Sequence, residues 1–501
     1  MKTAFYLCLL LNVGFLGTAS AADDAEAQTY GSIDFDASGS PEAHEVFIRG
    51  LLQLHNFEYD DARATFLATQ ELDPDFAMAY WGEALTHEHP LWSQHQPEAA
   101  RAVLAKLGET AEERAAKFPT AREKAYLHSI ELLFGDGSQE ERELRYSAAL
   151  GELHEDYPDD LDAAAFYALS LLTISHGGRD FALYMRSGAI TEEILDINPR
   201  HPGALHYSIH SYDDPIHAPL GLRAANLYAE VAPSAVHALH MGSHIYFALG
   251  MWELGTERNT RAFAEAVARQ ASPHDSYGSQ ANHALSWLIY ALNQQGMHEQ
   301  AAAKLALFED QLSRYGGNTE RQNFIAARAS YLVDSQDWDS HFATVPVDYD
   351  GLSPYFVATD QYIQGVLALK DADVEGAKTA LDAIGGAEPI QTRSRRAMVP
   401  RLLHLALAGQ MALAAGNTSD ALALMEEAAE LEASVPPEYG PAVPVQPTAE
   451  LLADTYMSLG EYELARQNYE LALQSSVGRQ RSLAGLEGAA HGLTLIVGSS
   501  L

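Results

Sequence analysis

Cysteine is almost absent from this sequence. The only one, Cys8, lies in an N-terminal apolar segment that we expect to be removed from the mature chain. The mature protein would then form no disulfide, and it would have no thiolate to bind a metal or attack a substrate. Any metal site must therefore use histidine, carboxylate, carbonyl or water ligands.

Basic residues are also scarce. The 501 residues include 31 Lys and Arg against 69 Asp and Glu, a formal net charge of −38. Nucleic-acid binding needs clustered Lys and Arg, so this balance disfavours it. It equally disfavours an anionic membrane surface. The charge suits a highly soluble protein, and it attracts cations.

Long apolar runs are confined to the N-terminus. Lys2 gives residues 1–21 a positive start, residues 4–16 are mostly apolar, and residues 19–21 form a small-x-small cleavage site. We expect a signal peptide cleaved near Ala21, and hence a periplasmic or secreted protein. No later stretch is predicted to span a membrane, which takes about 20 apolar residues.

Standard catalytic motifs are missing as well. The sequence contains no phosphate-cradling glycine-rich loop, no HExxH helix and no GxSxG elbow. Any chemistry must therefore come from an arrangement without a standard motif.

A helical repeat dominates what is present. The clearest copy, near the C-terminus, alternates bulky and small residues at Leu452, Ala453, Tyr456, Gly460, Tyr462, Ala465, Tyr469 and Ala472. Further copies lie at 59–74 and 405–431. Pro199 and Pro233, which end successive repeats, are 34 residues apart. Thirty-four is the period of the tetratricopeptide repeat.

On these residues the chain resembles the tetratricopeptide repeat superfamily over most of its mature length. More narrowly, it is similar to secreted bacterial repeat proteins that combine segments such as AYWGEALTHEHPLW and HPGALHYSIHSYDDPIHAPLGL. The resemblance implies an all-α solenoid, a right-handed superhelix of antiparallel helix pairs called A and B. It implies no particular activity.

The repeat and its interruptions predict five segments. They are a signal peptide at 1–21, an acidic flexible tail at 22–40, an N-terminal repeat array at 41–315, an irregular helical segment at 316–400, and C-terminal repeats at 401–495. A proline-rich stretch at 435–447 reads as an extended connector between the last two repeats.

Histidines concentrate in one stretch, residues 201–250, which holds seven of the chain's 21. His206 and His210 are four residues apart, as are His240 and His244, so each pair shares a helix face. The second pair follows the first by 34 residues, one repeat period. Two successive repeats therefore carry the same histidine pair.

The resemblance also implies where these side chains point. In the repeat family, positions 2, 5, 9, 12 and 13 of helix A line the concave groove. His206 and His240 take position 5, and His210 and His244 take position 9. His237 and His283 take position 2 of their repeats, and Asp213 and Asp214 take positions 12 and 13.

Adjacent A helices lie about 8–10 Å apart, so two i, i+4 histidine pairs can converge on a metal ion. We predict that His206, His210, His240 and His244 bind Cu, Zn or Fe, since imidazole ligands disfavour Mg and Ca. His237 would support this metal site, and Asp213 or Asp214 would orient ligands or accept protons. Possible additional ligands are His87, His89, His176, His217 and His283.

Two functional hypotheses follow. The first is a secreted metalloprotein, which as an enzyme would be a metal-dependent hydrolase or oxidoreductase. The second is an interaction scaffold that binds a peptide, a small molecule or an envelope protein in the groove without metal. Two simpler explanations stay open: hydrogen bonding between repeats for the histidines, and a cap and turn for Asp213-Asp214-Pro215.

Overall fold

A computed structural model describes residues 29–499 except 93, 177, 273–274, 387 and 393. The predicted signal peptide and residues 22–28 lie outside the described residues. The chain is 72% helical, with 23 α-helices in the described part. The predicted fold class, an all-α tetratricopeptide-type solenoid of antiparallel helix pairs, is confirmed.

The first half contains α2 (Pro41–His55), α3 (Tyr59–Leu72), α4 (Ala77–Leu85), α5 (Pro97–Ala105), α6 (Ala111–Ala115), α7 (Ala121–Leu133), α8 (Gln139–Asp156), α9 (Leu161–Thr173), α10 (Phe181–Ile197), α11 (Pro202–Tyr212), α12 (Ala218–Val231), α13 (Val236–Ala248) and α14 (Trp252–Ala268). The second half contains α15 (Ser279–Gln294), α16 (His298–Tyr315), α17 (Asn318–Ser335), α18 (Pro354–Lys370), α19 (Val374–Ile384), α20 (Arg395–Ala414), α21 (Thr418–Ala433), α22 (Thr448–Leu459), α23 (Tyr462–Ser475) and α24 (Gln480–Ser499).

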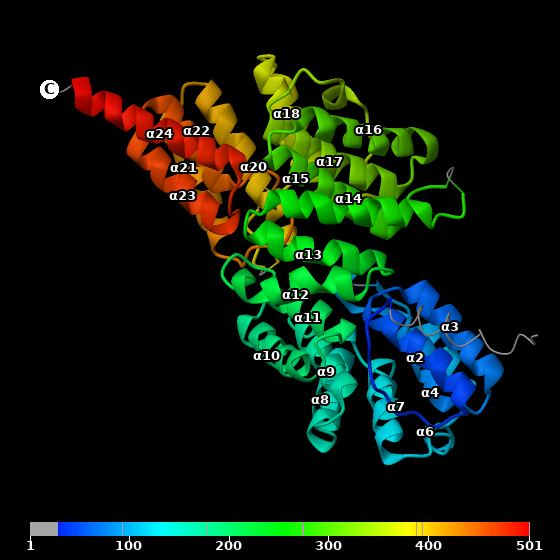
Figure 1. Cartoon of the computed structure of the whole chain (residues 1–501). Helices are drawn as coiled ribbons and strands as arrows, with labels where there is room; N and C mark the ends of the chain where they lie inside the picture. The colour runs from blue at the N-terminus through cyan, green and yellow to red at the C-terminus, as the bar shows by residue number, and fades with distance from the viewer. Residues whose placement is uncertain are drawn as a thin grey trace, which may run out of the picture.

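Short elements interrupt the helices in two places. Strands β1 (Glu88–His89) and β2 (Gln94–His95) form a small antiparallel hairpin around the 3-10 helix η1 (Pro90–Trp92). A second 3-10 helix, η2 (His341–Thr344), follows α17. These elements connect helices and do not change the helical layout (Figure 1).

Bulky side chains hold neighbouring helices together by filling gaps left by small residues. Phe66 of α3 packs against Gly50 of α2 and Gly82 of α4. A Cβ atom at Gly82 would lie 2.5 Å from the Phe66 ring, and one at Gly50 would lie 2.8 Å from it. Both distances are too short for a real contact, so glycine is required for this close packing.

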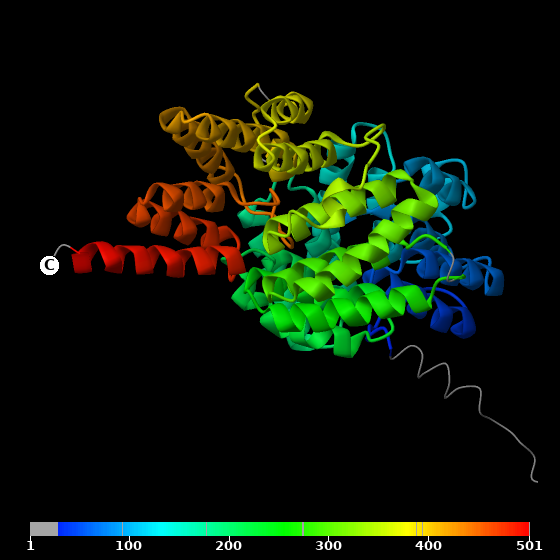
Figure 2. The same cartoon turned by 90° about the horizontal axis from the view of Figure 1, so that it is seen from above.

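The hydrophobic core divides earlier than the predicted boundary at residue 315. One cluster of buried side chains extends from Tyr30 to Tyr246, and a second extends from Leu285 to Ala489. A small aromatic cluster that includes Phe247 and Trp287 lies between them. The array thus forms two lobes that meet around α13 to α15 (Figure 1), and α24 projects from the second lobe (Figure 2).

Three other expectations are corrected. Residues 29–40 do not form a loose tail, because Phe35 is buried and Ser32 donates a backbone hydrogen bond to Arg200. The segment 316–400 is not irregular, since it contains α17, α18 and α19. One later helix among the described residues, α20, is long and apolar enough to cross a membrane. Its apolar side chains are largely buried, as expected of a core helix.

Candidate metal centre

Three neighbouring A helices carry the histidines. Helix α11 packs against α13, and α13 against α15. Pro202 occupies the first turn of α11, and the His201 side chain caps that turn by accepting from the backbone N–H of Ala204. The structure thereby brings together six of the predicted site residues. They are His206 and His210 from α11, His237, His240 and His244 from α13, and His283 from α15.

The four histidines of the predicted quartet share one hydrogen-bonding pattern at Nδ1. His206 donates to the backbone carbonyl of His55 at 3.0 Å. His210 and His244 lie 3.1 and 3.0 Å from Oδ2 of Asp213, a carboxylate that can only accept. In all three residues Nδ1 carries the proton, which leaves Nε2 as a lone-pair donor.

His240 follows the same pattern through an amide. Its Nδ1 lies 2.7 Å from Oδ1 of Asn259 on α14. The amide NH2 of Asn259 donates to the carbonyl of Gly255, so Oδ1 must be the acceptor for His240. The fixed tautomer again directs a lone pair of Nε2 toward the other histidines.

The Nε2 atoms face one another at short distances. His240 and His244 have their Nε2 atoms 3.1 Å apart, and His206 and His237 have theirs 3.0 Å apart. Nε2 of His210 is buried and has no hydrogen-bond partner among the described residues. Two nitrogens bound to one metal at about 2.0–2.1 Å lie about 2.9–3.4 Å apart, depending on geometry. The observed distances fall in that range.

The six histidines separate into two sets of three. Within each set, the candidate ligand atoms all lie within 4.8 Å of one another. We call His206, His210 and His237 the first triad, and His240, His244 and His283 the second triad. The predicted quartet therefore does not form one set, because each i, i+4 pair joins a position-2 histidine from the next A helix.

The triads lie inside the protein and not on an open groove, which corrects the predicted exposure. His206 is 0% exposed and His210 6%, while His283 is the most accessible of the six. A cavity of about 170 Å³ adjoins all of them except His206. Phe57, from the α2–α3 turn, contacts the His206 ring edge-on, with centroids 4.3 Å apart. The N-terminal repeat thus covers one side of the cavity.

The proline-rich connector covers the other side. Tyr439 stacks on His244, with ring centroids 4.9 Å apart, and lines the cavity. The buried guanidinium of Arg395 holds this segment through Glu432 and the carbonyls of Val435 and Pro436. The connector therefore does more than join two repeats, since it reaches the histidines of the other lobe.

Asp213 lies between the triads. Its carboxylate accepts from His210 and His244 and forms an ion pair with Arg179, while Asp214 pairs with Arg179 and His217. Burial alone would raise the pKa of Asp213, but the charge of Arg179 and the two imidazole donors hold it well below its usual range. Of the two roles predicted for Asp213, its contacts fit ligand orientation.

The environment favours neutral imidazoles. Burial lowers the pKa of His206, His237 and His240 well below the ordinary value, and neighbouring imidazoles lower it further. Burial also lowers the pKa of His244 to about 4, against the opposing hydrogen bond to Asp213. Neutral histidine is the form that ligates metals.

Four predicted additional ligands lie outside both triads. His87 is hydrogen-bonded to Gln96, and His89 uses both ring nitrogens on Gln94 and the Thr86 carbonyl. His176 lies 3.4 Å from Glu143, and His217 is bonded to Asp214. These contacts occupy all four side chains.

Sequence reasoning missed another buried cluster. His55 and His201 both approach Oδ1 of Asp162, at 2.9 and 3.5 Å. Because His55 also contacts the Tyr207 hydroxyl at 3.0 Å, this cluster links α2, α9 and α11 by hydrogen bonds. No spacing in the sequence joins residues that are more than 100 positions apart.

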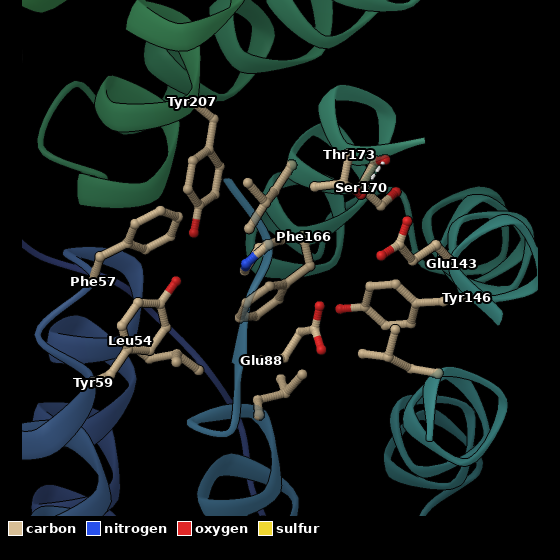
Figure 3. Close-up of a pocket in the computed structure, with 14 residues that line it drawn as sticks. Leu54, Phe57, Tyr59, Glu88, Glu143, Tyr146, Phe166, Ser170, Thr173 and Tyr207 are labelled. Carbon is tan, nitrogen blue, oxygen red and sulfur yellow. Dashed lines mark hydrogen bonds between the residues drawn. The ribbon is translucent and has the colours of Figure 1, made fainter. Parts of the chain in front are cut away.

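Two further cavities lie nearby. An outer cavity of about 380 Å³ shares Trp92, Gln94 and Gln280 with the histidine cavity, so the two are contiguous. A third, of about 40 Å³, receives the hydroxyls of Tyr59 and Tyr207 and the carboxylate of Glu88 (Figure 3). Its volume suits a few water molecules at about 10–15 Å³ each, and it is too small for a substrate.

The chain is thus a tetratricopeptide-type helical-repeat protein with an internal, histidine-lined cavity. No protein-family model and no curated protein matches it. Several solved structures are similar. Yeast Tom70 is 13% identical, with 91% of this chain and 96% of that chain covered and a TM-score of 0.37. The Cut9–Hcn1 complex of the APC/C is 14% identical, with 91% and 78% covered and a TM-score of 0.32. The P58(IPK) TPR domain is 12% identical, with 91% and 99% covered and a TM-score of 0.24. With scores this low, the fold assignment rests on the helix pairs of this chain.

Proposed function

We propose that this protein is a metalloprotein whose internal histidines bind a transition metal, Cu, Zn or Fe. The principal ligands are His206, His210, His240 and His244, as predicted, and His237 and His283 complete the donor set. Imidazole nitrogens without thiolates or carboxylates favour these metals over Mg and Ca. The net charge of −38 assists by attracting cations.

One observation carries the proposal: each member of the quartet donates Nδ1–H to a protein acceptor and turns Nε2 inward. Metal-binding histidines almost always have their second nitrogen fixed in this way, by a carbonyl or a carboxylate. A histidine that merely packs in a core needs no such uniform arrangement.

Hydrogen bonding between repeats is a poorer explanation. With both Nδ1 atoms protonated, neutral His240 and His244 present two lone pairs to each other at 3.1 Å. A cation between the two nitrogens removes this repulsion. A proton could do so, but burial lowers the pKa of both imidazoles. A metal ion satisfies both lone pairs without a buried imidazolium.

A metal-free scaffold that binds a peptide in the groove finds less support. Phe57 and Tyr439 of the same chain occupy the space over the histidines, and the remaining cavity has a volume of about 170 Å³. Small-molecule sites are typically about 300–1,000 Å³. The contiguous outer cavity, at about 380 Å³, has room for a small substrate that reaches the metal. A hydrolase or an oxidoreductase acting on a small molecule fits this layout.

Elemental analysis of untagged protein tests the proposal. After loading with Zn, Cu or Fe and exhaustive dialysis, we expect at least one tightly bound equivalent in the wild type. A His240→Ala, His244→Ala double variant should lose it. If this variant does not fold, the corresponding asparagine pair replaces it. The exposed, unclustered His341 provides a matched control, since His341→Ala should retain the metal. Wild-type protein that retains no metal under any loading condition refutes the proposal.

The same proposal includes export. It rests on the apolar N-terminal segment and the small-x-small sequence at residues 19–21. N-terminal sequencing of protein from a periplasmic or culture fraction should find a start near residue 22. An intact Met1 on cytoplasmic protein contradicts export and leaves the metal proposal standing.

A further inference from the structure

We infer that the histidine cavity binds two transition-metal ions side by side, one on each triad. This inference rests on the proposed metal binding and goes beyond it in number, position and ligand assignment. The two triads have no member in common, and each brings three nitrogens within 4.8 Å of one another. Three protein nitrogens leave a coordination position open on each ion.

The triads are the same structural unit in successive repeats. Each consists of an i, i+4 histidine pair on one A helix and the position-2 histidine of the next A helix. His206 and His210 of α11 join His237 of α13, and His240 and His244 of α13 join His283 of α15. Helix packing that forms one site therefore forms the other as well.

The unit occurs in these two repeats and not in the preceding one. At position 2 of α11, three residues before His206, the chain has Gly203. A Cβ atom there would lie 2.4 Å from Nδ1 of His55, so no side chain fits. The histidine pattern is therefore limited to two adjacent copies, as a two-ion centre requires.

Asp213 joins the two sites. Its Oδ2 accepts from His210 of the first triad and His244 of the second, and these two rings have centroids 5.0 Å apart. Since both imidazoles use Nδ1 for this contact, both ligate through Nε2. One carboxylate thus orients a ligand of each ion and gives the pair a common negative charge.

A single ion on the quartet is the main alternative. It would leave His237 and His283 without a role, and it would leave Nε2 of His237 beside Nε2 of His206 at 3.0 Å. The cavity adjoins His237 and His283 together with His210, His240 and His244, which places both triads on one internal space. Two ions account for all six side chains.

Copper is the metal that these donors favour most. None of the six ligands is a carboxylate, and first-row divalent ions bind nitrogen sites most tightly at copper. Ions can reach the triads through the outer cavity, whose lining includes Glu58, Asp60 and Asp61 against Arg269. This excess of carboxylates attracts cations to the mouth.

Copper stoichiometry in single-triad variants tests the inference. Untagged, metal-free protein is titrated with Cu(II), and bound copper is measured after gel filtration. We expect two equivalents in the wild type and in the surface control His341→Ala. His237→Ala and His283→Ala should each retain one. Neither residue has a printed partner at Nδ1 to leave unpaired, and circular dichroism of each variant verifies folding.

The outcomes separate the two proposals. No bound copper or other metal in the wild type refutes metal binding itself. One equivalent in the wild type, lost in the His240→Ala, His244→Ala variant, supports metal binding and overturns the two-ion centre. Two equivalents retained with unchanged affinity in both single variants overturn the triad assignment.

Electron paramagnetic resonance of the wild type needs no variant. Two neighbouring Cu(II) ions should couple, so the integrated signal should fall below that of two isolated ions. A signal equal to two isolated ions means that the bound ions are far apart, which contradicts the inference.

Discussion

Replacing Asp213 by asparagine should weaken both metal binding and folding. The carboxylate is 1% exposed and accepts from His210 and His244 while it pairs with Arg179. Asparagine keeps the shape, but it loses the charge and replaces one oxygen with an NH2 group. At least one of these contacts must then be lost, because an NH2 group cannot accept a hydrogen bond.

Two separate magnitudes follow. Removing one partner of a buried ion pair costs about 3–5 kcal/mol. Asp214 still lies 3.2 Å from Arg179 in the variant, so we expect the lower end, about 3 kcal/mol. Loss of the second contact of a metal-bound histidine typically weakens metal affinity about 10–100-fold. We expect a loss in that range for Asp213→Asn.

Urea unfolding measures the first effect, and competition with a chromophoric chelator measures the second. The matched control is Asp162→Asn, which removes another buried carboxylate bonded to histidines but outside both triads. It should reduce stability and leave metal affinity unchanged. Adding Arg179→Met to Asp213→Asn should restore part of the stability and none of the affinity. Metal affinity of Asp213→Asn within about threefold of wild type refutes the orienting role, since second contacts are worth at least about tenfold.

Three other variants test neighbouring contacts. Asn259→Ala removes the acceptor for Nδ1 of His240 and should weaken metal binding about 10–100-fold; Asn259→Asp keeps an acceptor and should bind within a few fold of wild type, and equal losses in both variants contradict the argument. Tyr439→Ala uncovers the cavity and should speed metal release to EDTA while stoichiometry stays constant, so an unchanged release rate indicates that the connector does not cover the exit. Burial raises the pKa of Glu58 to about 7, which makes the folded state less favourable as pH rises from the unfolded value of 4.5 through 7; Glu58→Gln should therefore stabilise the protein at pH 8 by up to about 3 kcal/mol, at 1.36 kcal/mol per unit, and by much less at pH 5. The exposed Asp61→Asn should show no such dependence on pH, and an equal effect of Glu58→Gln at both pH values would sink the assignment.

The fold and the grouping of the quartet onto neighbouring helices were predictable from sequence because both follow from a short period. A repeat of 34 residues fixes which positions of successive A helices correspond, so equal spacings become equal places. The quartet residues accordingly lie on α11 and α13, which pack together. Local spacing failed at the next level, since it suggested one four-histidine set where the structure has two sets of three.

The covering of the site could not be predicted. Tyr439 reaches His244 across 195 positions of sequence, and Phe57 reaches His206 across 149. Both depend on how the superhelix curves, and that curvature accumulates from small rotations in every repeat. Asn259 was missed for another reason. It lies on a B helix, α14, and side chains of B helices are not expected to face the groove.

Closure of the groove changes what the fold can do here. An open tetratricopeptide groove presents A-helix side chains to an extended partner, and its polar residues remain hydrated. In this chain the N-terminal repeat and the connector exclude a partner from the same positions, and burial keeps the imidazoles neutral. Neutral, preoriented imidazoles in a small internal cavity suit metal ions, because an ion binds in a space where a peptide does not fit. The repeat architecture contributes the second copy of the site, since each A helix supplies a histidine pair to its own triad and a position-2 histidine to the triad before it. On this reasoning a metal-free partner of the protein would bind the outer surface, and its binding would be insensitive to substitution of either triad.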